Sequence, residues 1–236
     1  YRKAIKIEPD NAEVYCNLGS ILKDIGRLNE AELLYRRAIK IKYDDAELHS
    51  NLGLVLKDLG RLQEAEISQR KAIELNPDSA QAHCNLGSIL RDLGKSKESF
   101  DSFFQVIEIN PTYSNAYSLI TEFLRDSDPS QLNQSKLKKI LHLLLERNDI
   151  CHKELTRAFK FVYSHEIISN LEKIYFDFSE INLLVNKKVI INGLKKIIFC
   201  DLKLEKMLTN ARRNICNVIA KNIETVNESE LQFIIA

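Results

Sequence analysis

The sequence has few of the features that mark a catalytic, disulfide-bonded or membrane protein. It contains no glycine-rich phosphate loop, and its five cysteines are odd in number and show no C-x-x-C spacing. No apolar run approaches the length of a membrane span, and no charged-then-apolar signal segment is present. The 34 Lys and Arg residues nearly balance the 33 Asp and Glu residues, so no overall field favours nucleic acid or an anionic membrane. These absences favour a cytoplasmic protein with reduced thiols, and they argue against a zinc site, a disulfide framework, a nucleic-acid partner and a membrane partner.

Two short motifs resemble parts of catalytic sites but are incomplete. His165 and Glu166 begin like a zinc-protease helix, but no second histidine follows four residues after His165. Cys151 and His152 are adjacent, so they point to different faces of a helix and do not form a nucleophile–base pair. The sequence therefore predicts no catalytic residue, no metal site and no cofactor, and we expect that this chain is not an enzyme.

A repeat of fixed length organises the first half of the chain. Equivalent residues recur every 34 positions, as in Ala4, Ala38 and Ala72; Leu18, Leu52 and Leu86; Gly19, Gly53 and Gly87; and Gly26, Gly60 and Gly94. A fixed period of this length is typical of stacked structural repeats.

The repeat unit is predicted to be a pair of helices. In residues 46–79, apolar residues first fall on one helical stripe that ends at Gly60, a residue that can close a helix in the left-handed conformation. A second stripe then ends before Pro77, which cannot continue a helix. Gly53 lies inside the first helix, where glycine costs roughly 1 kcal/mol relative to alanine. Its recurrence indicates a close contact between the two helices.

These residues resemble the tetratricopeptide repeat family. The family pattern has a bulky residue at position four, Leu-Gly at seven and eight, Gly at fifteen, Ala at twenty and twenty-seven, an aromatic residue near twenty-four and Pro at thirty-two. Matching residues are Tyr15, Leu18, Gly19, Gly26, Ala31, Tyr35 and Ala38; His49, Leu52, Gly53, Gly60, Ala65, Ala72 and Pro77; and His83, Leu86, Gly87, Gly94, Phe103 and Pro111. The chain departs from the pattern at Tyr43, Gln69, Ser99 and Val106. The resemblance implies an all-α, right-handed superhelix, an α-solenoid of helical hairpins, in which the position-four residues pack against a neighbouring helix.

The repeat array is expected to occupy residues 1–126 and to be followed by an irregular helical extension, residues 127–236. The array comprises a partial repeat (1–11), full repeats (12–45, 46–79 and 80–113) and a degenerate repeat (114–126). Helical segments of the extension are predicted near 129–147, 150–164, 166–176, 180–199 and 201–222, with another from Asn227. Asp128 and Pro129 have the types preferred at a helix start. We expect both ends of the chain to be truncated.

Residues 201–236 resemble the helical linker of bacterial repeat-containing methyltransferases. If this similarity holds, the S-adenosylmethionine-binding residues lie outside this chain. The chain is then the substrate-recruiting arm of a larger methyl or glycosyl transferase.

A polar stripe recurs on the first helix of each repeat and forms the candidate binding site. Its members are Glu13, Asn17, Ser20, Lys23 and Asp24; Glu47, Asn51, Leu54, Lys57 and Asp58; and Gln81, Asn85, Ser88, Arg91 and Asp92. In the family, the first helices line the concave side of the superhelix. A repeated asparagine of this kind resembles the repeats of O-linked N-acetylglucosamine transferase, where it helps to hold protein substrates.

Two interpretations of this stripe stay open. The asparagine amides offer donors and an acceptor to the backbone of an extended peptide, or they bond only neighbouring helices and water. The adjacent Lys-Asp and Arg-Asp residues either only keep the helix ends hydrated, with Lys and Arg interacting favourably with the helix dipole, or contact a partner. We favour a non-catalytic module that binds an extended segment of a protein or peptide partner in the concave groove, with the transferase arm as the alternative.

Overall fold

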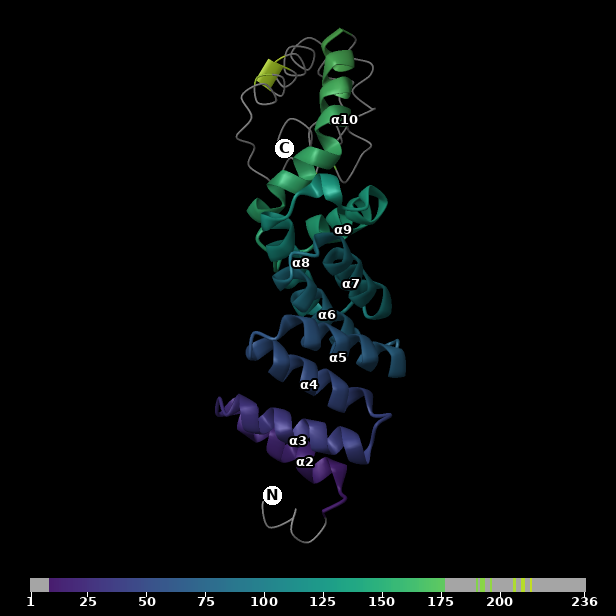
Figure 1. Ribbon diagram of the computed structural model, residues 1–236. Helices are drawn as coiled ribbons and strands as arrows, with labels where there is room; N and C mark the ends of the chain where they lie inside the picture. Colours follow the sequence, from purple (N-terminus) through teal and green to yellow (C-terminus); the bar gives the residue numbers. More distant parts are fainter. Residues whose placement is uncertain are drawn as a thin grey trace. The chain divides into compact units, whose positions relative to one another are not determined.

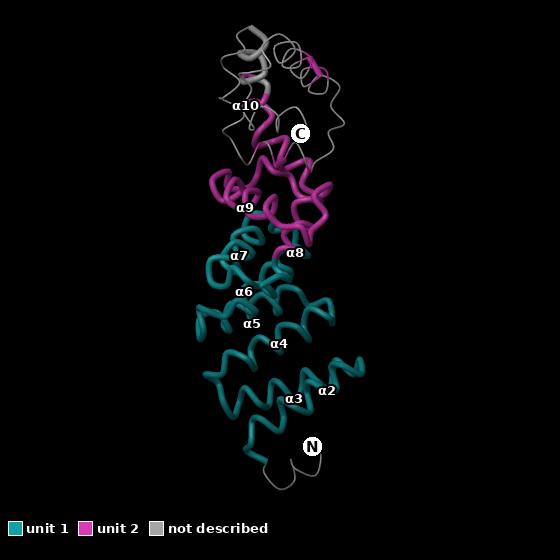
Figure 2. Tube along the Cα trace, turned by 180° about the vertical axis from the view of Figure 1, so that it is seen from behind, with its two compact units in different colours: residues 1–116 teal, residues 117–236 magenta. Residues whose placement is uncertain are grey.

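The computed structural model describes residues 9–176 and, beyond them, only residues 190, 192, 193, 196, 206, 209, 210 and 213. The chain divides into two compact units, residues 1–116 and 117–236 (Figure 2). Helix α8 (Ser114–Asp126), where the degenerate repeat is predicted, spans the boundary between them. The described residues contain helices and no β-strand, so the predicted all-α fold is confirmed.

The first compact unit is a succession of helical hairpins (Figure 1). Its helices are α2 (Ala12–Asp24), α3 (Leu28–Ile41), α4 (Ala46–Asp58), α5 (Leu62–Leu75), α6 (Ala80–Asp92) and α7 (Ser96–Ile109). Each first helix packs mainly against the second helix that follows it, giving the pairs α2–α3, α4–α5 and α6–α7. Helix starts recur with the 34-residue period seen in the sequence. The predicted solenoid of helical hairpins is confirmed.

Local sequence signals set the ends of the first helices. The side chains of Asn11, Asp45 and Ser79 accept hydrogen bonds from backbone N–H groups in the first turns of α2, α4 and α6. Such capping satisfies donors that have no partner within the helix. At the other end, Gly26, Gly60 and Gly94 have φ of 78°, 77° and 73°, which residues with a side chain rarely adopt. Each hairpin therefore turns at the glycine predicted from the sequence.

The recurring glycine within each first helix lies against the side chain that fills the aromatic position of the second helix. A Cβ atom on Gly19 would lie 3.1 Å from the Tyr35 ring, and one on Gly87 would lie 2.7 Å from the Phe103 ring. In the second repeat, a Cβ atom on Gly53 would lie 3.2 Å from Cγ of Gln69. The close helix contact predicted from these glycines is present in all three hairpins.

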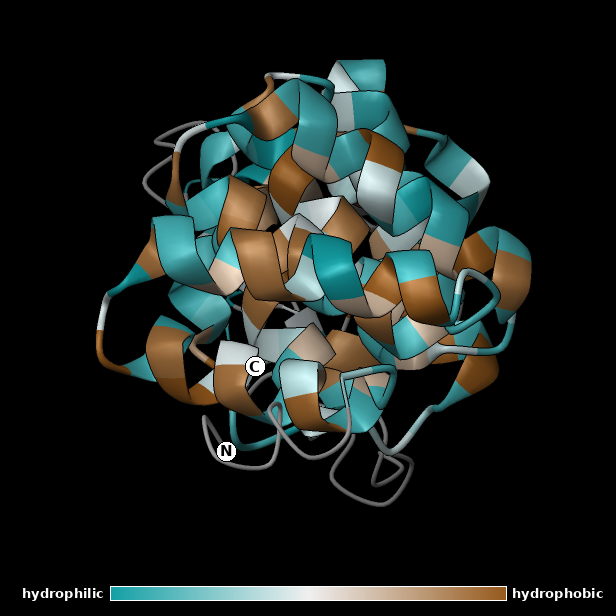
Figure 3. Cartoon of the chain, turned by 60° about the horizontal axis from the view of Figure 1, so that its bottom comes forward, coloured by the Kyte–Doolittle hydropathy of each residue, from teal (hydrophilic) through white to brown (hydrophobic). Residues whose placement is uncertain are grey.

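The hydrophobic core continues from one repeat to the next. One cluster of buried side chains draws on all three repeats, with Leu22, Ala31, Tyr35, Leu52, Val55, Leu56, Ala65 and Ile89 as members. Hydrophobic and hydrophilic residues alternate along the helices (Figure 3), as expected for elements that bury one face. Such a core spreads along the array, as is usual in repeat proteins.

The position-four residues share one contact across the repeats. Tyr15 Oη donates to the carbonyl oxygen of Pro9 at 3.0 Å. The Nε2 atoms of His49 and His83 lie 2.8 Å and 2.9 Å from the carbonyl oxygens of Tyr43 and Pro77, respectively. Each side chain thus ties a first helix to the loop that precedes it.

The second compact unit departs from the predicted helix boundaries. Its elements are η1 (Pro129–Gln131), α9 (Gln134–Glu146), η2 (His152–Leu155) and α10 (Thr156–Phe176), where η denotes a 3₁₀ helix. The single helix predicted over 129–147 is wrong. Asp128 does cap a helix, but that helix is only η1, and Asn133 caps α9 by accepting from the Lys136 N–H at 3.1 Å.

The predicted break near residue 165 is also wrong, because α10 runs through it. Phe159, Tyr163 and Ile167 are buried and lie four residues apart, so one apolar face continues across the expected break. The helices predicted over 180–199 and 201–222 and from Asn227, and the linker resemblance of 201–236, lie almost wholly outside the described residues.

Candidate functional site

The predicted site residues lie on the first helices of the three repeats, on α2, α4 and α6. We call these fifteen residues the first-helix row; they are Glu13, Asn17, Ser20, Lys23, Asp24, Glu47, Asn51, Leu54, Lys57, Asp58, Gln81, Asn85, Ser88, Arg91 and Asp92. The carboxylates of Glu13 and Glu47 are exposed, Asn17 and Asn51 are half-buried, and Asn85 is buried. Most of the row is therefore accessible from solvent.

Part of the row meets in a groove of about 470 Å³, which we call the first-helix groove. From the row it takes Glu47, Asn51 and Leu54 of α4 and Gln81 and Asn85 of α6. The remaining lining residues are Ala46, Ser50, Ala72, Asn76, Ser79 and Ala82. The lining is rich in amide and hydroxyl groups, so this groove can form hydrogen bonds with either a donor or an acceptor.

The asparagines of the row bond to the preceding repeat. Asn51 Nδ2 donates to Sγ of Cys16 at 3.8 Å, and Asn85 Nδ2 donates to Oγ of Ser50 at 3.3 Å. The acceptor lies 35 residues earlier in both cases, so the two contacts are equivalent. Within the described residues, no side-chain hydrogen bond is made by Asn17. The asparagine row therefore contributes to stacking as well as lining the groove.

The amides of the third repeat form a connected chain of hydrogen bonds. Tyr113 Oη donates to Oε1 of Gln81, and Gln81 Nε2 donates to Oδ1 of Asn85 at 2.8 Å. Asn85 in turn donates to Ser50. These hydrogen bonds orient Gln81 and Asn85 at the wall of the groove. Both the oxygen and the nitrogen of the Asn85 amide are therefore bonded within the protein.

The charged members of the row differ between repeats. Lys57 Nζ lies 3.4 Å from Asp92 Oδ2, an ion pair that joins α4 to α6. Lys23, Asp24 and Asp58 make no ion pair among the described residues. The second and third repeats therefore use one Lys–Asp contact for stacking, while the charges of the first repeat face solvent.

The serines of the row are oriented by neighbouring groups. Ser20 Oγ and Tyr35 Oη lie 2.8 Å apart and share a hydrogen bond. Ser88 Oγ donates to the carbonyl oxygen of Cys84 at 3.2 Å, a contact within its own helix. These hydroxyls have partners in the fold, so the amides and Leu54 are the stronger candidates for contact with a ligand.

The cysteines near the row are poor nucleophiles. Burial raises the pKa of the Cys16 thiol, and the Glu47 carboxylate raises that pKa further. Burial likewise raises the pKa of Cys84. Both thiols therefore stay protonated near neutral pH, whereas the thiolate is the reactive form. In the part of the chain that is described, no three His, Cys, Asp or Glu side chains converge as a metal site.

Several residues at or near the groove were not predicted as site residues. Asn76 and Ser79 line the groove from the loop between α5 and α6, and Tyr113 orients Gln81. Ser50, which lies in the same polar stripe directly before Asn51, accepts the Asn85 bond. The loop and Tyr113 contacts depend on how one hairpin stacks on the next, which no spacing within one repeat reveals.

Comparison with known proteins places the first part of the chain in one family. A model described as TPR repeat matches residues 19–60, and two models described as Tetratricopeptide repeat match residues 1–32 and 69–100 and residues 46–79. A comparison with curated proteins gives no match. Repeats of this family bind protein or peptide partners and are in general non-catalytic interaction modules. Among the described residues, no helix combines the length and the apolarity needed to cross a membrane.

Solved structures share the same fold. A crystal structure of MamA is 25% identical over 62% of this chain and 83% of that chain, with a TM-score of 0.54. A second MamA crystal structure is 22% identical over 70% of this chain and 81% of that chain, with a TM-score of 0.50. A Thermobaculum terrenum O-GlcNAc transferase mutant is 24% identical over 55% of this chain and 25% of that chain, with a TM-score of 0.48. The family models, which match within residues 1–100, identify this part of the chain as tetratricopeptide repeats.

Proposed function

We propose that this chain is a non-catalytic protein-interaction module whose first-helix row binds an extended segment of a protein partner. The observation that carries the proposal is the first-helix groove, in which amide and hydroxyl groups from two successive repeats line one space of about 470 Å³. Amide and hydroxyl groups offer both donors and acceptors, which match the backbone of an extended peptide whatever its side chains.

The asparagines have different roles in this proposal. Asn51 donates one amide N–H to Sγ of Cys16, so its side-chain oxygen and second N–H are available to a peptide. No described residue bonds to the Asn17 side chain, so its amide is offered to a ligand. Asn85 is 8% exposed and bonded on both sides, so it holds Gln81 and Ser50 in place instead of contacting the partner.

Leu54 half-faces the groove and offers one apolar contact within this polar row.

The affinity for one segment is expected to be modest. A few amide contacts must offset the ordering of the peptide, so we expect a dissociation constant near the micromolar range, about −8 kcal/mol. Such an affinity is measurable by capture at high protein concentration.

A capture experiment with a matched control tests the proposal. Wild-type chain and the variant Asn17→Ala/Asn51→Ala serve as baits, and retained proteins are identified by mass spectrometry. The control carries Asn29→Ala and Gln63→Ala, two amide removals at exposed positions of the second helices α3 and α5. We expect partners to be lost only with the first variant, whose stability should fall by no more than the loss of the single Asn51–Cys16 hydrogen bond, about 0.5–1.5 kcal/mol. Equal retention by all three baits would contradict the proposal.

A further inference from the structure

A separate groove, of about 1010 Å³, lies along helix α3. We call it the α3 groove. Five of its lining residues form one stripe of that helix: Leu33, Arg36, Arg37, Lys40 and Ile41. They lie three, four, seven and eight residues after the first of them, which places all five on one face of α3. None of them belongs to the first-helix row, so the α3 groove is a different surface from the first-helix groove.

The two ends of the stripe are apolar and open to solvent. Leu33 is 68% exposed and Ile41 is 37% exposed. This exposure is not caused by the position of α3 near one end of the array. Ile67, which stands 34 residues after Leu33, is 69% exposed although its repeat has another repeat before it and after it. Leu33 and Ile41 therefore offer apolar surface that the stacking of repeats does not cover.

The middle of the stripe is basic. Arg36 is held by two carboxylates, at 2.8 Å and 3.2 Å. Arg37 lies over the Tyr15 ring, with Cζ 5.3 Å from the ring centroid, and it pairs with no carboxylate in the described part of the chain. Lys40 is exposed and likewise makes no ion pair there. Against these three cations the lining contains one acidic residue, Asp10, so the groove attracts negative charge.

The next repeat neutralises the same positions within its own helix. Glu74 stands 34 residues after Lys40, and it pairs at 2.9 Å with Lys71, the equivalent of Arg37. In α3, Lys40 instead follows Arg36 and Arg37 by four and three residues, a spacing at which like charges repel. Because α5 folds and stacks with a carboxylate at this position, the fold does not require the lysine. An anionic partner gives the three cations a role that the fold does not.

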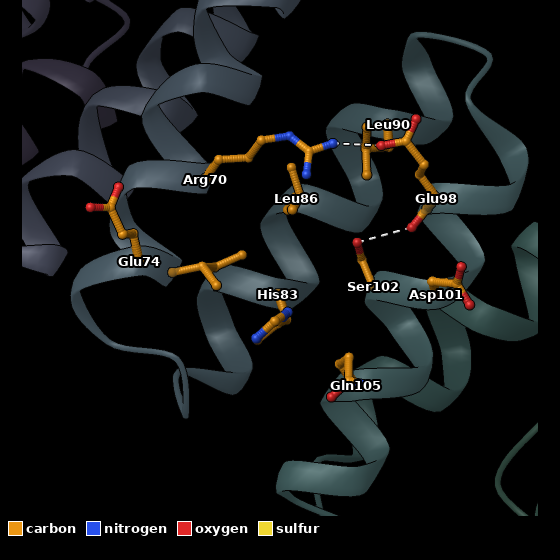
Figure 4. Close-up of a pocket in the computed structure, with 10 residues that line it drawn as sticks. Arg70, Glu74, His83, Leu86, Leu90, Glu98, Asp101, Ser102 and Gln105 are labelled. Carbon is orange, nitrogen blue, oxygen red and sulfur yellow. Dashed lines mark hydrogen bonds and ion pairs between the residues drawn. The ribbon is translucent and has the colours of Figure 1, made fainter.

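The corresponding groove of the third repeat is occupied by contacts within the chain (Figure 4). Its residues His83, Asp101, Ser102 and Gln105 stand 68 residues after Tyr15, Leu33, Leu34 and Arg37 of the α3 groove. Arg70 reaches across it and donates to Glu98 at 2.6 Å, and its leucines, Leu86 and Leu90, are 4% and 1% exposed. Of these two grooves, only the α3 groove combines exposed apolar side chains with cations that have no carboxylate partner among the described residues.

We propose that the α3 groove docks a short acidic protein segment that carries an apolar side chain on either side of its carboxylates. The carboxylates pair with Arg37 and Lys40, and the apolar side chains pack on Leu33 and Ile41. These two residues are eight positions apart, which is about 12 Å along the helix axis. Four steps of an extended segment span about 13–14 Å. The site is independent of the first-helix row, so one chain can hold two segments at once.

Methyl NMR of the whole chain with a defined peptide tests the proposal. The probe is a terminally blocked Leu-Glu-Asp-Glu-Leu peptide, and the controls are Gly-Glu-Asp-Glu-Gly and Leu-Lys-Arg-Lys-Leu. We expect the probe to shift the methyl signals of Leu33 and Ile41. The signals of Ile67, equally exposed but beside a neutralised cation, and of Leu54, in the first-helix groove, should not shift. Neither control peptide should shift any of them, because one lacks the apolar side chains and the other lacks the carboxylates.

Two variants with matched controls identify the groups that recognise the probe. Lys40→Glu installs the residue of the next repeat and should weaken probe binding at least about tenfold. Its melting temperature should stay the same or rise, because the repulsion within α3 is removed. Lys97→Glu makes the same charge change at an exposed lysine of α7 and should change binding by less than about twofold. Leu33→Gln should weaken binding about three- to tenfold, and Ile67→Gln should leave it unchanged.

Four results would overturn the proposal. Absent shifts at Leu33 and Ile41, or equal shifts at Ile67, would mean that the probe does not select this groove. Equal binding of the glycine peptide would mean that the apolar ends take no part. Equal weakening by Lys97→Glu would mean that overall charge attracts the probe. Vesicles containing phosphatidylserine that bind the wild type, but not Lys40→Glu, while the probe does not bind would assign the surface to a membrane.

Discussion

Gln69 occupies the position that an aromatic ring fills in the hairpins before and after it. Tyr35, Gln69 and Phe103 are equivalent and are all at most 1% exposed. Gln69 Nε2 makes a long contact of 3.4 Å with the carbonyl oxygen of Ser50, while Oε1 is buried with no partner among the described residues. An unsatisfied buried acceptor costs about 1–3 kcal/mol, so this residue is a weak point of the second hairpin.

Replacing Gln69 by methionine should stabilise the chain. Methionine keeps the length of the side chain and removes the unpaired oxygen, so we expect the free energy of unfolding to rise by about 1 kcal/mol. Chemical denaturation gives the value. Gln63→Met, the same change at an exposed position of α5, is the control and should shift stability by less than about 0.5 kcal/mol. A less stable Gln69→Met would mean that the amide has partners that compensate for its burial.

The glycines of the first helices should differ in their tolerance of alanine. A Cβ at position 87 would lie 2.7 Å from the Phe103 ring, whereas one at position 53 would lie 3.2 Å from Cγ of Gln69 and 3.3 Å from the backbone oxygen of Ala65. Gly87→Ala should therefore lower the free energy of unfolding by about 1–3 kcal/mol. For Gly53→Ala, the gain in helix propensity of about 1 kcal/mol should largely offset the crowding. Thermal melts of both variants check the order, and equal losses would refute this account of the contacts.

At the scale of helices, ion pairs connect the second helices of neighbouring repeats. Glu32 contacts Arg36 and Arg61, at 2.8 Å in each case. The same pattern recurs 34 residues later, where Glu66 contacts Arg70 at 2.9 Å and Lys95 at 2.7 Å. The two carboxylates are only 12% and 11% exposed, so solvent screens them less than a surface pair. Each carboxylate thus joins two repeats.

The Glu66 contacts should make stability depend on pH. Burial alone would raise the pKa of Glu66, but hydrogen bonds from Lys95 and Arg70 outweigh burial, and the net shift is downward. The stabilisation is therefore complete above the unfolded-state pKa of about 4.3, and it is lost as the pH falls through the lower folded-state pKa.

Glu66→Gln should lower the free energy of unfolding by about 1–2 kcal/mol at pH 7, and this loss should shrink towards zero as the pH falls below about 4. Urea denaturation at several pH values gives the difference between wild type and variant. Glu74→Gln, at a carboxylate 69% exposed, is the control and should change stability by less than about 0.5 kcal/mol. A loss at pH 7 that persists unchanged at low pH would contradict the role given to the carboxylate charge.

In the second compact unit, Lys196 closes the C-terminal end of α9. Its Nζ atom donates to the carbonyl oxygens of Leu145 and Arg147 at 2.7 Å and 3.1 Å, and it lies 3.2 Å from Oδ1 of Asn148. A cation at this end also complements the helix dipole. These contacts join residues about 50 positions apart in the chain, so they hold Lys196 at the end of α9.

Lys196→Met should loosen that connection. We expect a local loss of about 1–2 kcal/mol, seen as faster hydrogen exchange in peptides covering residues 144–152. Lys206→Met, a change at an exposed lysine, should leave exchange in these peptides unchanged. Unaltered exchange in Lys196→Met would show that the lysine contributes nothing to the end of α9.

At the scale of the whole molecule, the sequence predicts the repeat array better than the region that follows. Within the array, caps such as Asp45 and turns such as Gly60 mark each hairpin, and the 34-residue period repeats every signal three times. After residue 126 no period reinforces a local signal. The break before α9 was missed because Asp128 and Asn133 are both acceptable caps. The α10 helix was divided although its buried face is continuous.

The first-helix row was predicted only as a pattern on individual helices. Spacing places Asn51 and Asn85 on equivalent faces, but not the acceptors that lie 35 residues earlier on another helix. The hydrogen bond from Tyr113 to Gln81 likewise depends on stacking. As a result, the sequence could not separate the asparagine that mainly holds the fold from those that remain available to a partner.

Site-specific photo-cross-linking tests the central claim, binding at the first-helix row, most directly. A photoreactive residue is placed at Leu54, in the first-helix groove, or at Ile67, which is 69% exposed on the second helix α5. The cross-linked partner peptides are then sequenced. We predict that Leu54 cross-links to a contiguous segment of a partner protein, and that Asn17→Ala/Asn51→Ala removes these products. Cross-links formed at Ile67 alone, or Leu54 products that survive the double variant, would contradict binding at the first-helix row.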